Sequence, residues 1–186
     1  ETDRFLTFVD DFNNTIDKER LLYTTGGVAD NQTTGSISDL ALYKNRVMAT
    51  SVAGDNLVLA SRPLEQGFSC GFPLIAPFQI LIQDQSEKIT GIEKMPDFFL
   101  CFSQSNVYAV FGDGPNEAGI GAFTGPKNIG PNQGMVEGTP HLSTSLGVFY
   151  ISERGLYLVT SNTQIGYLGA SIEDAFIENS VTAASP

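Results

Sequence analysis

Residues 98–111 read FFLCFS-QS-NVYAVF, and this stretch decides the fold class. Two runs of aromatic, branched and small apolar residues flank the polar pair Gln104-Ser105. Short runs of this composition on either side of a turn are typical of an antiparallel β-hairpin. The stretch therefore predicts two strands, Phe98–Phe102 and Asn106–Phe111, joined by a tight turn.

The same strand–turn–strand unit occurs once before this stretch and once after it. The earlier copy covers residues 45–61 and turns at Gly54-Asp55, and the later copy covers residues 148–160 and turns at Glu153-Arg154. A unit of this kind has an apolar face that only a neighbouring unit can cover. Aligning the copies on a period of about fifty residues brings together two sets of apolar residues: Leu57, Val107 and Leu156, and Leu59, Ala109 and Leu158.

Further strands lie before and between the hairpins. They are predicted at Ser36–Leu42, Ile89–Lys94, His141–Leu146, Gln79–Ile82 and Gln164–Leu168. Four strands per unit is the pattern of a β-propeller blade, and three blades are too few to close a ring. We therefore predict an all-β fold of antiparallel hairpin repeats, an incomplete β-propeller with blade-like units near 36–83, 88–125 and 140–170. A β-sandwich built from the same hairpins is the alternative architecture.

The two ends of the chain do not follow the repeat. Residues 1–20 are predicted to form an N-terminal strand, Arg4–Val9, followed by a linker, so that the repeat domain covers residues 21–186. Near the C-terminus Ser171 can cap one short helix, Ile172–Glu178. The first turn of this helix is acidic, which the helix dipole favours.

Composition places the chain among soluble globular proteins. Of its 186 residues 41% are hydrophobic and 17% charged, and the 19 glycines and 9 prolines suit many tight turns. The formal net charge of −11 argues against binding nucleic acid or an anionic membrane surface, because carboxylates repel phosphates. The sequence has no long apolar run, so we predict no membrane insertion.

Two cysteines and one histidine are the candidate reactive side chains. Cys70 and Cys101 both lie in apolar stretches, so we expect buried free thiols in a protein made in a reducing cytoplasm. A Cys–His dyad of His141 with either cysteine is one interpretation. Neither cysteine lies in a recognisable nucleophile motif, so a polar or partly buried structural histidine is favoured.

Carboxylates supply the other candidate sites. The local pairs Asp10/Asp11, Asp113/Glu117 and Glu173/Asp174 have the residue types of a glycosidase, but such pairs are ordinary features of loops and helix starts. Residues 11–17 are rich in oxygen ligands but fail the EF-hand pattern. The turn 112–117 is interpreted as a loop in which glycine supplies positive φ rather than as a cation site. We therefore predict no catalytic, cofactor-binding or metal-binding residues and a protein that is not an enzyme.

Several distinctive strings follow one another along the chain. They are Leu22–Val28 with Asp30-Asn31, then Tyr43–Val47, Tyr108–Asn116, Gly147–Tyr150 and Gly155–Leu158. Their order resembles the propeller-like region of structural proteins from tailed phages, especially tail hub or nozzle proteins of short-tailed phages. The resemblance covers residues 10–176, and proteins of this kind are usually several times longer. It implies a virion component at the tail or portal end and carries over no catalytic residues.

The predicted function combines the repeat with this resemblance. We expect a virion structural protein that forms a homo-oligomeric ring and contacts other tail or portal proteins. Double-stranded DNA is expected to pass an acidic channel wall without specific binding, because carboxylates repel its phosphates. The alternative is a propeller or sandwich binding module that recognises a host glycan or protein through the long loop 112–138.

Overall fold

The computed structural model describes residues 34–51, 56–64, 70–73, 75–82 and 88–171. The expected strand Arg4–Val9 and helix Ile172–Glu178 lie outside these residues. Within them the regular structure is almost entirely β, with two short 3-10 turns, η1 (Ala76–Phe78) and η2 (Gly169–Ser171). The predicted all-β class is confirmed.

The strands form three antiparallel sheets of four strands each, and in every sheet they are neighbours in chain order. Strands that follow one another in sequence usually pair, and each sheet is a simple meander even where a longer segment joins β3 to β4 and β7 to β8. Sheet 1 contains β1 (Ile37–Tyr43), β2 (Arg46–Ser51), β3 (Leu57–Ala60) and β4 (Gln79–Leu81); sheet 2 contains β5 (Ile89–Lys94), β6 (Phe98–Ser103), β7 (Asn106–Phe111) and β8 (Lys127–Pro131); sheet 3 contains β9 (Leu142–Thr144), β10 (Gly147–Ser152), β11 (Gly155–Val159) and β12 (Ile165–Tyr167).

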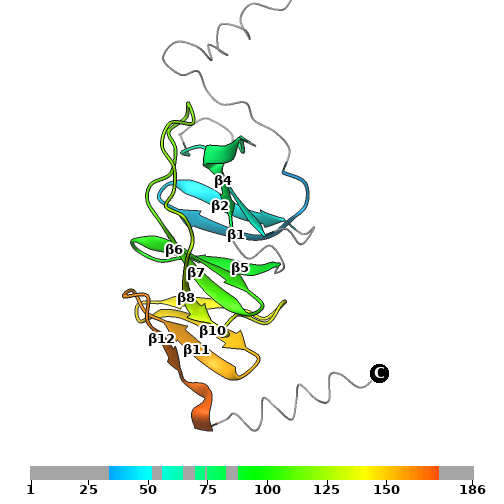
Figure 1. Ribbon diagram of the computed structural model, residues 1–186, viewed down its shortest axis with the longest axis vertical. Coiled ribbons are helices and arrows are strands. Elements are labelled where there is room, and N and C mark those ends of the chain that lie inside the picture. The colour runs from blue at the N-terminus through cyan, green and yellow to red at the C-terminus, as the bar shows by residue number, and fades with distance from the viewer. Residues whose placement is uncertain (1–33, 52–55, 65–69, 74, 83–87, 172–186) are drawn as a thin grey trace, which may run out of the picture.

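The three sheets stack along the long axis of the molecule, with sheet 2 in the middle (Figure 1). Strand β6 is buried along its whole length because its side chains alternate between two apolar clusters. Phe99 and Cys101 belong to the cluster shared with sheet 1, whereas Leu100 and Phe102 belong to the cluster shared with sheet 3. Sheet 2 therefore contributes both of its faces to the core.

All three sheets face the same way along the stack. A register shift lies opposite Thr50 in sheet 1 and opposite Phe102 in sheet 2, so these two positions correspond. The cross-strand pairs at equivalent positions are then Ala49–Leu59, Cys101–Tyr108 and Tyr150–Tyr157. Cys101 and Tyr108 belong to the cluster between sheets 1 and 2, and Tyr150 and Tyr157 belong to the cluster between sheets 2 and 3. Each sheet thus has a front face toward the sheet 1 end of the stack and a back face toward the sheet 3 end.

One part of the predicted repeat alignment is wrong by one residue. Val107 points to the back of its sheet, in the cluster with sheet 3. In sheet 1 it is Val58, not Leu57, that lies in the corresponding back-face cluster. The connection between β2 and β3 is longer than the turn at Gln104-Ser105, and a slip of one residue moves every side chain to the other face.

The fourth strand of sheet 2 was absent from the prediction, which ended the second unit at residue 125. Strand β8 pairs with β7 through a register shift between Val107 and Tyr108. Its Gly130 and Pro131 are residues that sequence patterns assign to loops. Pro131 is tolerated because β8 lies at the edge of the sheet, where no further strand in the described residues needs its missing N–H.

Candidate functional site

The front face of sheet 1 is apolar and, in the part of the chain that the structure describes, no other sheet covers it. Leu40, Leu42 and Leu81 are 56%, 51% and 51% exposed, whereas Ala49 and Leu59 at its centre are buried. We call this surface the front end face and define it by the residues that pair across β1 to β4 on this side, all apolar except Gln79: Leu40, Leu42, Val47, Ala49, Leu57, Leu59, Gln79 and Leu81.

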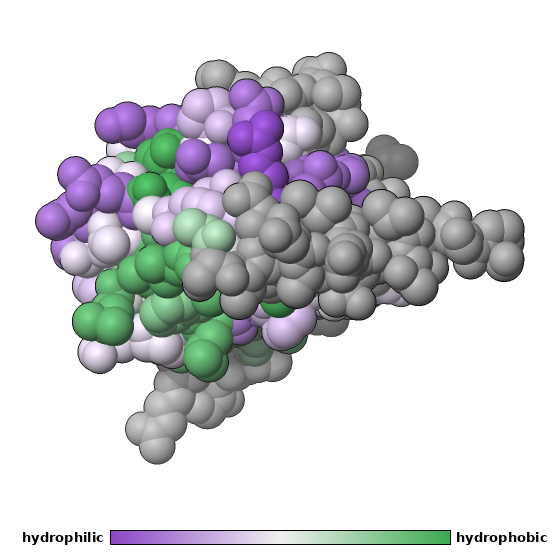
Figure 2. All heavy atoms as spheres, turned by 90° about the horizontal axis from the view of Figure 1, so that it is seen from below, coloured by the Kyte–Doolittle hydropathy of each residue, from purple (hydrophilic) through white to green (hydrophobic). Residues whose placement is uncertain are grey.

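The back face of sheet 3 has the same character at the other end of the stack. Leu142 is 64% and Leu168 is 46% exposed. Seen from below, hydrophobic residues gather on this end of the molecule (Figure 2). We call this surface the back end face and define it by the apolar residues that alternate with the buried front-face residues of sheet 3: Leu142, Phe149, Ile151, Leu156, Leu158 and Leu168.

Neither end face includes a charged residue, although the whole chain carries 21 acidic and 10 basic side chains. In a stack of repeats the terminal units normally present a polar outer surface that keeps the protein soluble. Contiguous apolar patches on a protein surface mark sites where another macromolecule binds. The two end faces are therefore the first candidate functional surfaces.

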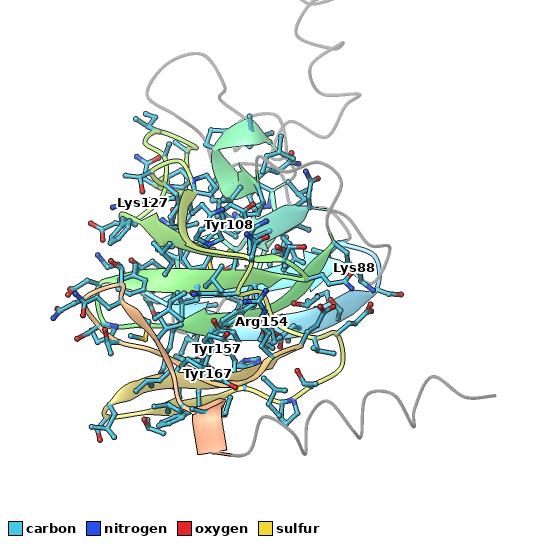
Figure 3. The ribbon with its side chains drawn as sticks, turned by 60° about the horizontal axis from the view of Figure 1, so that its bottom comes forward. Lys88, Tyr108, Lys127, Arg154, Tyr157 and Tyr167 are labelled. Atoms are coloured by element: carbon cyan, nitrogen blue, oxygen red, sulfur yellow. The ribbon has the colours of Figure 1, made fainter. Side chains whose placement is uncertain are left out.

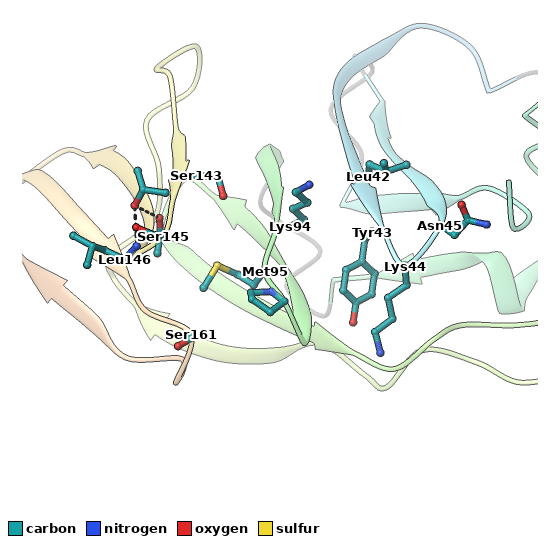
Figure 4. Close-up of a pocket in the computed structure, with 13 residues that line it drawn as sticks. Leu42, Tyr43, Lys44, Asn45, Lys94, Met95, Ser143, Ser145, Leu146 and Ser161 are labelled. Carbon is teal, nitrogen blue, oxygen red and sulfur yellow. Dashed lines mark hydrogen bonds between the residues drawn. The ribbon is translucent and has the colours of Figure 1, made fainter.

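A groove of about 570 Å³ is the second candidate. It follows one rim of the stack, where the first turn of each sheet contributes side chains (Figure 4). Lys44, Lys94 and Ser145 come from the turns of sheets 1, 2 and 3, and Leu42 and Leu146 add apolar walls. The turn of sheet 3 is fixed because the Thr144 hydroxyl donates to the Gly147 carbonyl at 2.9 Å.

The joint between sheets 1 and 2 contains a buried cation that sequence reasoning did not single out. Arg46 is only 4% exposed. Its guanidinium donates to the carbonyls of Asp113 at 3.1 Å, of Ser61 at 2.9 Å and of Pro115. Burial lowers the pKa of Arg46, but three carbonyl acceptors favour the charged form. Arg46 thereby ties the loop after β7 to sheet 1.

Two further polar contacts support this joint. The Lys44 ammonium pairs with the Asp113 carboxylate, and this hydrogen bond lowers the pKa of Asp113 and raises that of Lys44. The Asp39 carboxylate of β1 accepts the backbone N–H of Ile92 in β5 at 2.8 Å. Burial raises the pKa of Tyr43, whose hydroxyl donates to the Asp97 carbonyl at 2.9 Å. The joint is therefore specified by hydrogen bonds as well as by its apolar cluster.

The joint between sheets 2 and 3 is aromatic. Ring centroids lie 4.9 Å apart for Phe102 and Tyr150, 5.7 Å for Tyr150 and Tyr157, and 5.0 Å for Tyr157 and Tyr167. Figure 3 shows Tyr157 and Tyr167 close together on sheet 3. The Tyr150 hydroxyl donates to the Gln133 carbonyl at 2.7 Å, and burial raises its pKa.

The expected histidine and cysteines are separated in the structure. Cys101 is buried in the cluster between sheets 1 and 2, and burial raises the pKa of its thiol. His141 lies on the other side of sheet 2, with its ring 6.0 Å from Phe102 and its Nε2 3.5 Å from the Glu93 carboxylate. A Cys101–His141 dyad is therefore contradicted, and the interpretation of His141 as a partly buried residue is confirmed. Cys70 is exposed, so its expected burial is wrong: an apolar local sequence does not by itself place a thiol in the core.

The carboxylate pairs and the calcium-like segments were interpreted as ordinary loop features, and the described part of them can be compared with the structure. Asp113 pairs with Lys44, and the described residues hold no group of three or more acidic, histidine or cysteine side chains that could bind a metal. The turn at 112–117 behaves as interpreted, since Gly112 and Gly114 have positive φ and Asn116 accepts the N–H groups of Ala118 and Ile120. The segment 11–17 and the pairs Asp10/Asp11 and Glu173/Asp174 lie outside the described residues.

The long loop 112–138 contacts the sheets of its own chain. Phe123 packs against the cluster between sheets 1 and 2, with its ring 5.9 Å from that of Phe99. Further along, Met135 is buried in the cluster between sheets 2 and 3, and the Val136 N–H donates to the Ile151 carbonyl at 3.0 Å. The loop therefore joins neighbouring sheets instead of standing free as a binding surface.

The sequence contains one signal for the buried cation at the joint between sheets 1 and 2. Arg46 occupies the position of Phe98 in sheet 2 and of Gly147 in sheet 3, so a cation stands where the repeat puts a buried residue. A charge at such a position needs internal partners. The partners Asp113 and Pro115 are distant in sequence, and pattern reasoning does not locate them.

Comparisons with known protein families and curated proteins give no relative from which a function could be carried over. No helix among the described residues has the length and hydrophobicity needed to cross a bilayer. Neither a protein-family model nor a curated protein sequence matches this chain.

Proposed function

We propose that this chain is a non-enzymatic structural module of a virion, part of a propeller-like tail hub or nozzle of a short-tailed phage. The observation that carries the structural role is the pair of apolar end faces on a stack of sheets that all point the same way. Such a stack is stable in water only when a neighbour covers each end. A module of this kind builds an assembly rather than acting alone.

The arrangement of sheets 1 and 2 supports blade-like stacking. Strands β1 and β5 approach each other more closely than any other strands of the two sheets. On the far side, the loop 112–126 lies beside β4: Phe123 packs against the shared cluster, Gly119 lies against Ile75, and a pocket of about 360 Å³ remains between β4 and residues 122–126. Sheets that converge at their first strands and separate toward their fourth strands are arranged like spokes around an axis, as propeller blades are.

Two strings that carry the phage resemblance meet at one joint. Tyr43–Val47 forms the turn between β1 and β2, and Gly112–Asn116 forms the loop after β7. Arg46 and Lys44 of the first string bind Asp113 and Pro115 of the second. The two strings therefore make the contact between sheets 1 and 2, and a contact that fixes neighbouring sheets supports a structural role.

The proposed role includes passage of double-stranded DNA through the assembly without specific binding. The net charge of −11 supports it, because a surface that repels phosphates lets DNA slide. A filter-binding titration of the purified chain with duplex DNA at low salt tests this part. Retention of DNA that weakens steeply with added salt would contradict it.

The test of the structural role uses the end faces directly. The chain is mixed with purified portal and tail proteins of short-tailed phages, and association is followed by size-exclusion chromatography with light scattering. We expect a stable complex that is lost when Leu142→Asp or Leu40→Asp places a carboxylate on an end face. Ile120→Asp is the matched control because Ile120 is 65% exposed on a loop outside both end faces. Absence of any complex, with every variant folded, would contradict the virion role.

A second candidate function is favoured by the rim groove. Its lysines, hydroxyl groups and flanking leucines suit a polar ligand with a small apolar part, such as a glycan or a peptide. Glycan-array and peptide-array binding compares the parent chain with Lys94→Ala. Specific binding that depends on Lys94 would support a recognition module, and binding that ignores the substitution would exclude the groove.

A further inference from the structure

We propose that the occupant of each end face is a second copy of this chain, so that two copies stack head to tail and close a ring of six sheets. The front end face of one copy packs on the back end face of the other, and the reverse contact closes the ring. This inference rests on the proposed structural role and names its partner.

The direction of the stack is the first support. Inside the chain, the back face of sheet 1 packs on the front face of sheet 2, and the back face of sheet 2 packs on the front face of sheet 3. Among the described residues, the faces that no other sheet covers are therefore one front and one back, which is the combination that already forms both internal joints. Neither joint among the described residues packs two front faces or two back faces against each other. A contact between different surfaces of identical subunits is heterologous, and it forms a ring when the rotation closes.

The chemistry of the two end faces is the second support. Exposed leucines border the front end face at Leu40, Leu42 and Leu81, around a centre at Ala49 and Leu59 that is already buried, and Leu142 and Leu168 are exposed on the back end face. Neither contains a charged residue, so their contact buries no unpaired charge in spite of the high net charge of each copy. The acidic surface repels copies that meet in any other orientation, which leaves these two patches as the surfaces of contact.

The splay of the sheets is the third support. Sheets 1 and 2 contact each other most extensively at β1 and β5, so this pair of sheets splays apart toward the fourth strands, and a ring forms when the same splay recurs at the other joints. A curved stack with a fixed direction returns to its start after a small number of sheets. Two copies of the three sheets supply six, and propellers close with about four to eight blades.

The mass in solution is the first measurement. We expect light scattering and sedimentation to give twice the 20.0 kDa of one chain, with no growth at higher concentration because a closed ring has no free end face. Leu40→Asp and Leu142→Asp, introduced separately, each alter both contacts of the ring and should weaken association by at least about 100-fold. Ile120→Asp should leave the mass unchanged. Circular dichroism of each variant confirms that the sheets remain folded.

Mixing the two disruptive variants tests the head-to-tail arrangement. In a mixed pair, one contact carries both substitutions and the other is unaltered, so association should recover in part. A front-to-front dimer predicts that Leu142→Asp has no effect and that mixing restores nothing. Either of those results would overturn the proposal.

Cross-linking gives an independent readout in a Cys70→Ser background, which removes the exposed thiol. A chain with Leu40→Cys is mixed with a chain with Leu158→Cys under mild oxidation. We expect a disulfide-linked pair only in the mixture, and none in either chain alone or with Ile120→Cys as the partner. A monomer with no cross-link at any concentration would overturn the second-copy inference, yet association with the tail proteins through the same faces would still support the virion role. A closed dimer that ignores the tail proteins would support the inference and count against that role.

Discussion

Between sheets 1 and 2 a buried arginine and several carboxylate and carbonyl contacts fix the geometry, whereas between sheets 2 and 3 a row of aromatic rings does so. Arg46 reaches three carbonyl groups at the first joint, and the Phe102–Tyr150–Tyr157–Tyr167 row spans the second. Hydrogen bonds from a charged donor fix the orientation of the two sheets. Buried aromatic rings stabilise a joint mainly through the apolar area that they remove from water. The same stacking geometry is thus reached by two kinds of chemistry.

The largest expected effect is at the aromatic joint. Phe102→Ala removes a fully buried ring from between sheets 2 and 3 and should lower the free energy of unfolding by about 4 kcal/mol, because a cavity remains. Urea unfolding followed by circular dichroism measures the loss. Ile120→Ala is the control on an exposed loop and should change little. A loss under about 1 kcal/mol for Phe102→Ala would show that the ring row does not hold the joint.

Arg46→Met should have the next largest effect and should act on the other joint. Methionine keeps the stem but leaves the carbonyls of Ser61, Asp113 and Pro115 without their donor, which costs about 3 kcal/mol. Hydrogen exchange with mass spectrometry should show faster exchange in the loop 112–126 and in sheet 1, with sheet 3 unchanged. An equal increase in exchange at both joints would show that they open as one cooperative unit, and the two joints could then not be compared separately.

Tyr150→Phe sharpens the comparison, because it keeps the ring and removes only the hydroxyl. The lost hydrogen bond to the Gln133 carbonyl should lower the free energy of unfolding by about 1 kcal/mol. Urea unfolding beside Tyr167→Phe, whose hydroxyl donates to the Arg154 carbonyl at an exposed position, separates the loss of an exposed hydrogen bond from the loss at the joint. A cost for Tyr150→Phe as large as that for Phe102→Ala would show that the aromatic joint also depends on hydrogen bonding.

The smallest effect concerns pH at the arginine joint. Lys44 holds the pKa of Asp113 below its usual value, so their contact stabilises the fold above about pH 4 and is lost as the pH falls through the depressed pKa. Both side chains are substantially exposed, with Asp113 at 81%, so the contribution is modest. The urea midpoint of Asp113→Asn should fall slightly below that of the parent chain at neutral pH and coincide with it in strong acid. A difference that persists in acid would point to a cause other than this ion pair.

The fold was largely predictable because short alternating runs and turn pairs are local signals. The hairpin at 98–111 has the predicted strands, with β6 one residue longer. Strand β8 was missed because Gly130 and Pro131 mask an edge strand, and the first unit was misaligned because its longer connection shifts the register. The joints were much less predictable, since Arg46 and Asp113 meet across sequence-distant segments and no local pattern records that contact.

The directional stack also bears on how the protein is made. A ribosome delivers the sheets in the order 1, 2, 3, and each new sheet covers the back face of the one before it while presenting its own. A nascent chain that has reached residue 131 therefore exposes Phe98, Leu100 and Phe102 until the next forty or so residues emerge. At every stage of synthesis the most recently completed sheet offers a fresh apolar face. If two copies assemble as proposed, neighbouring nascent chains on one messenger present such faces to each other before either chain is released.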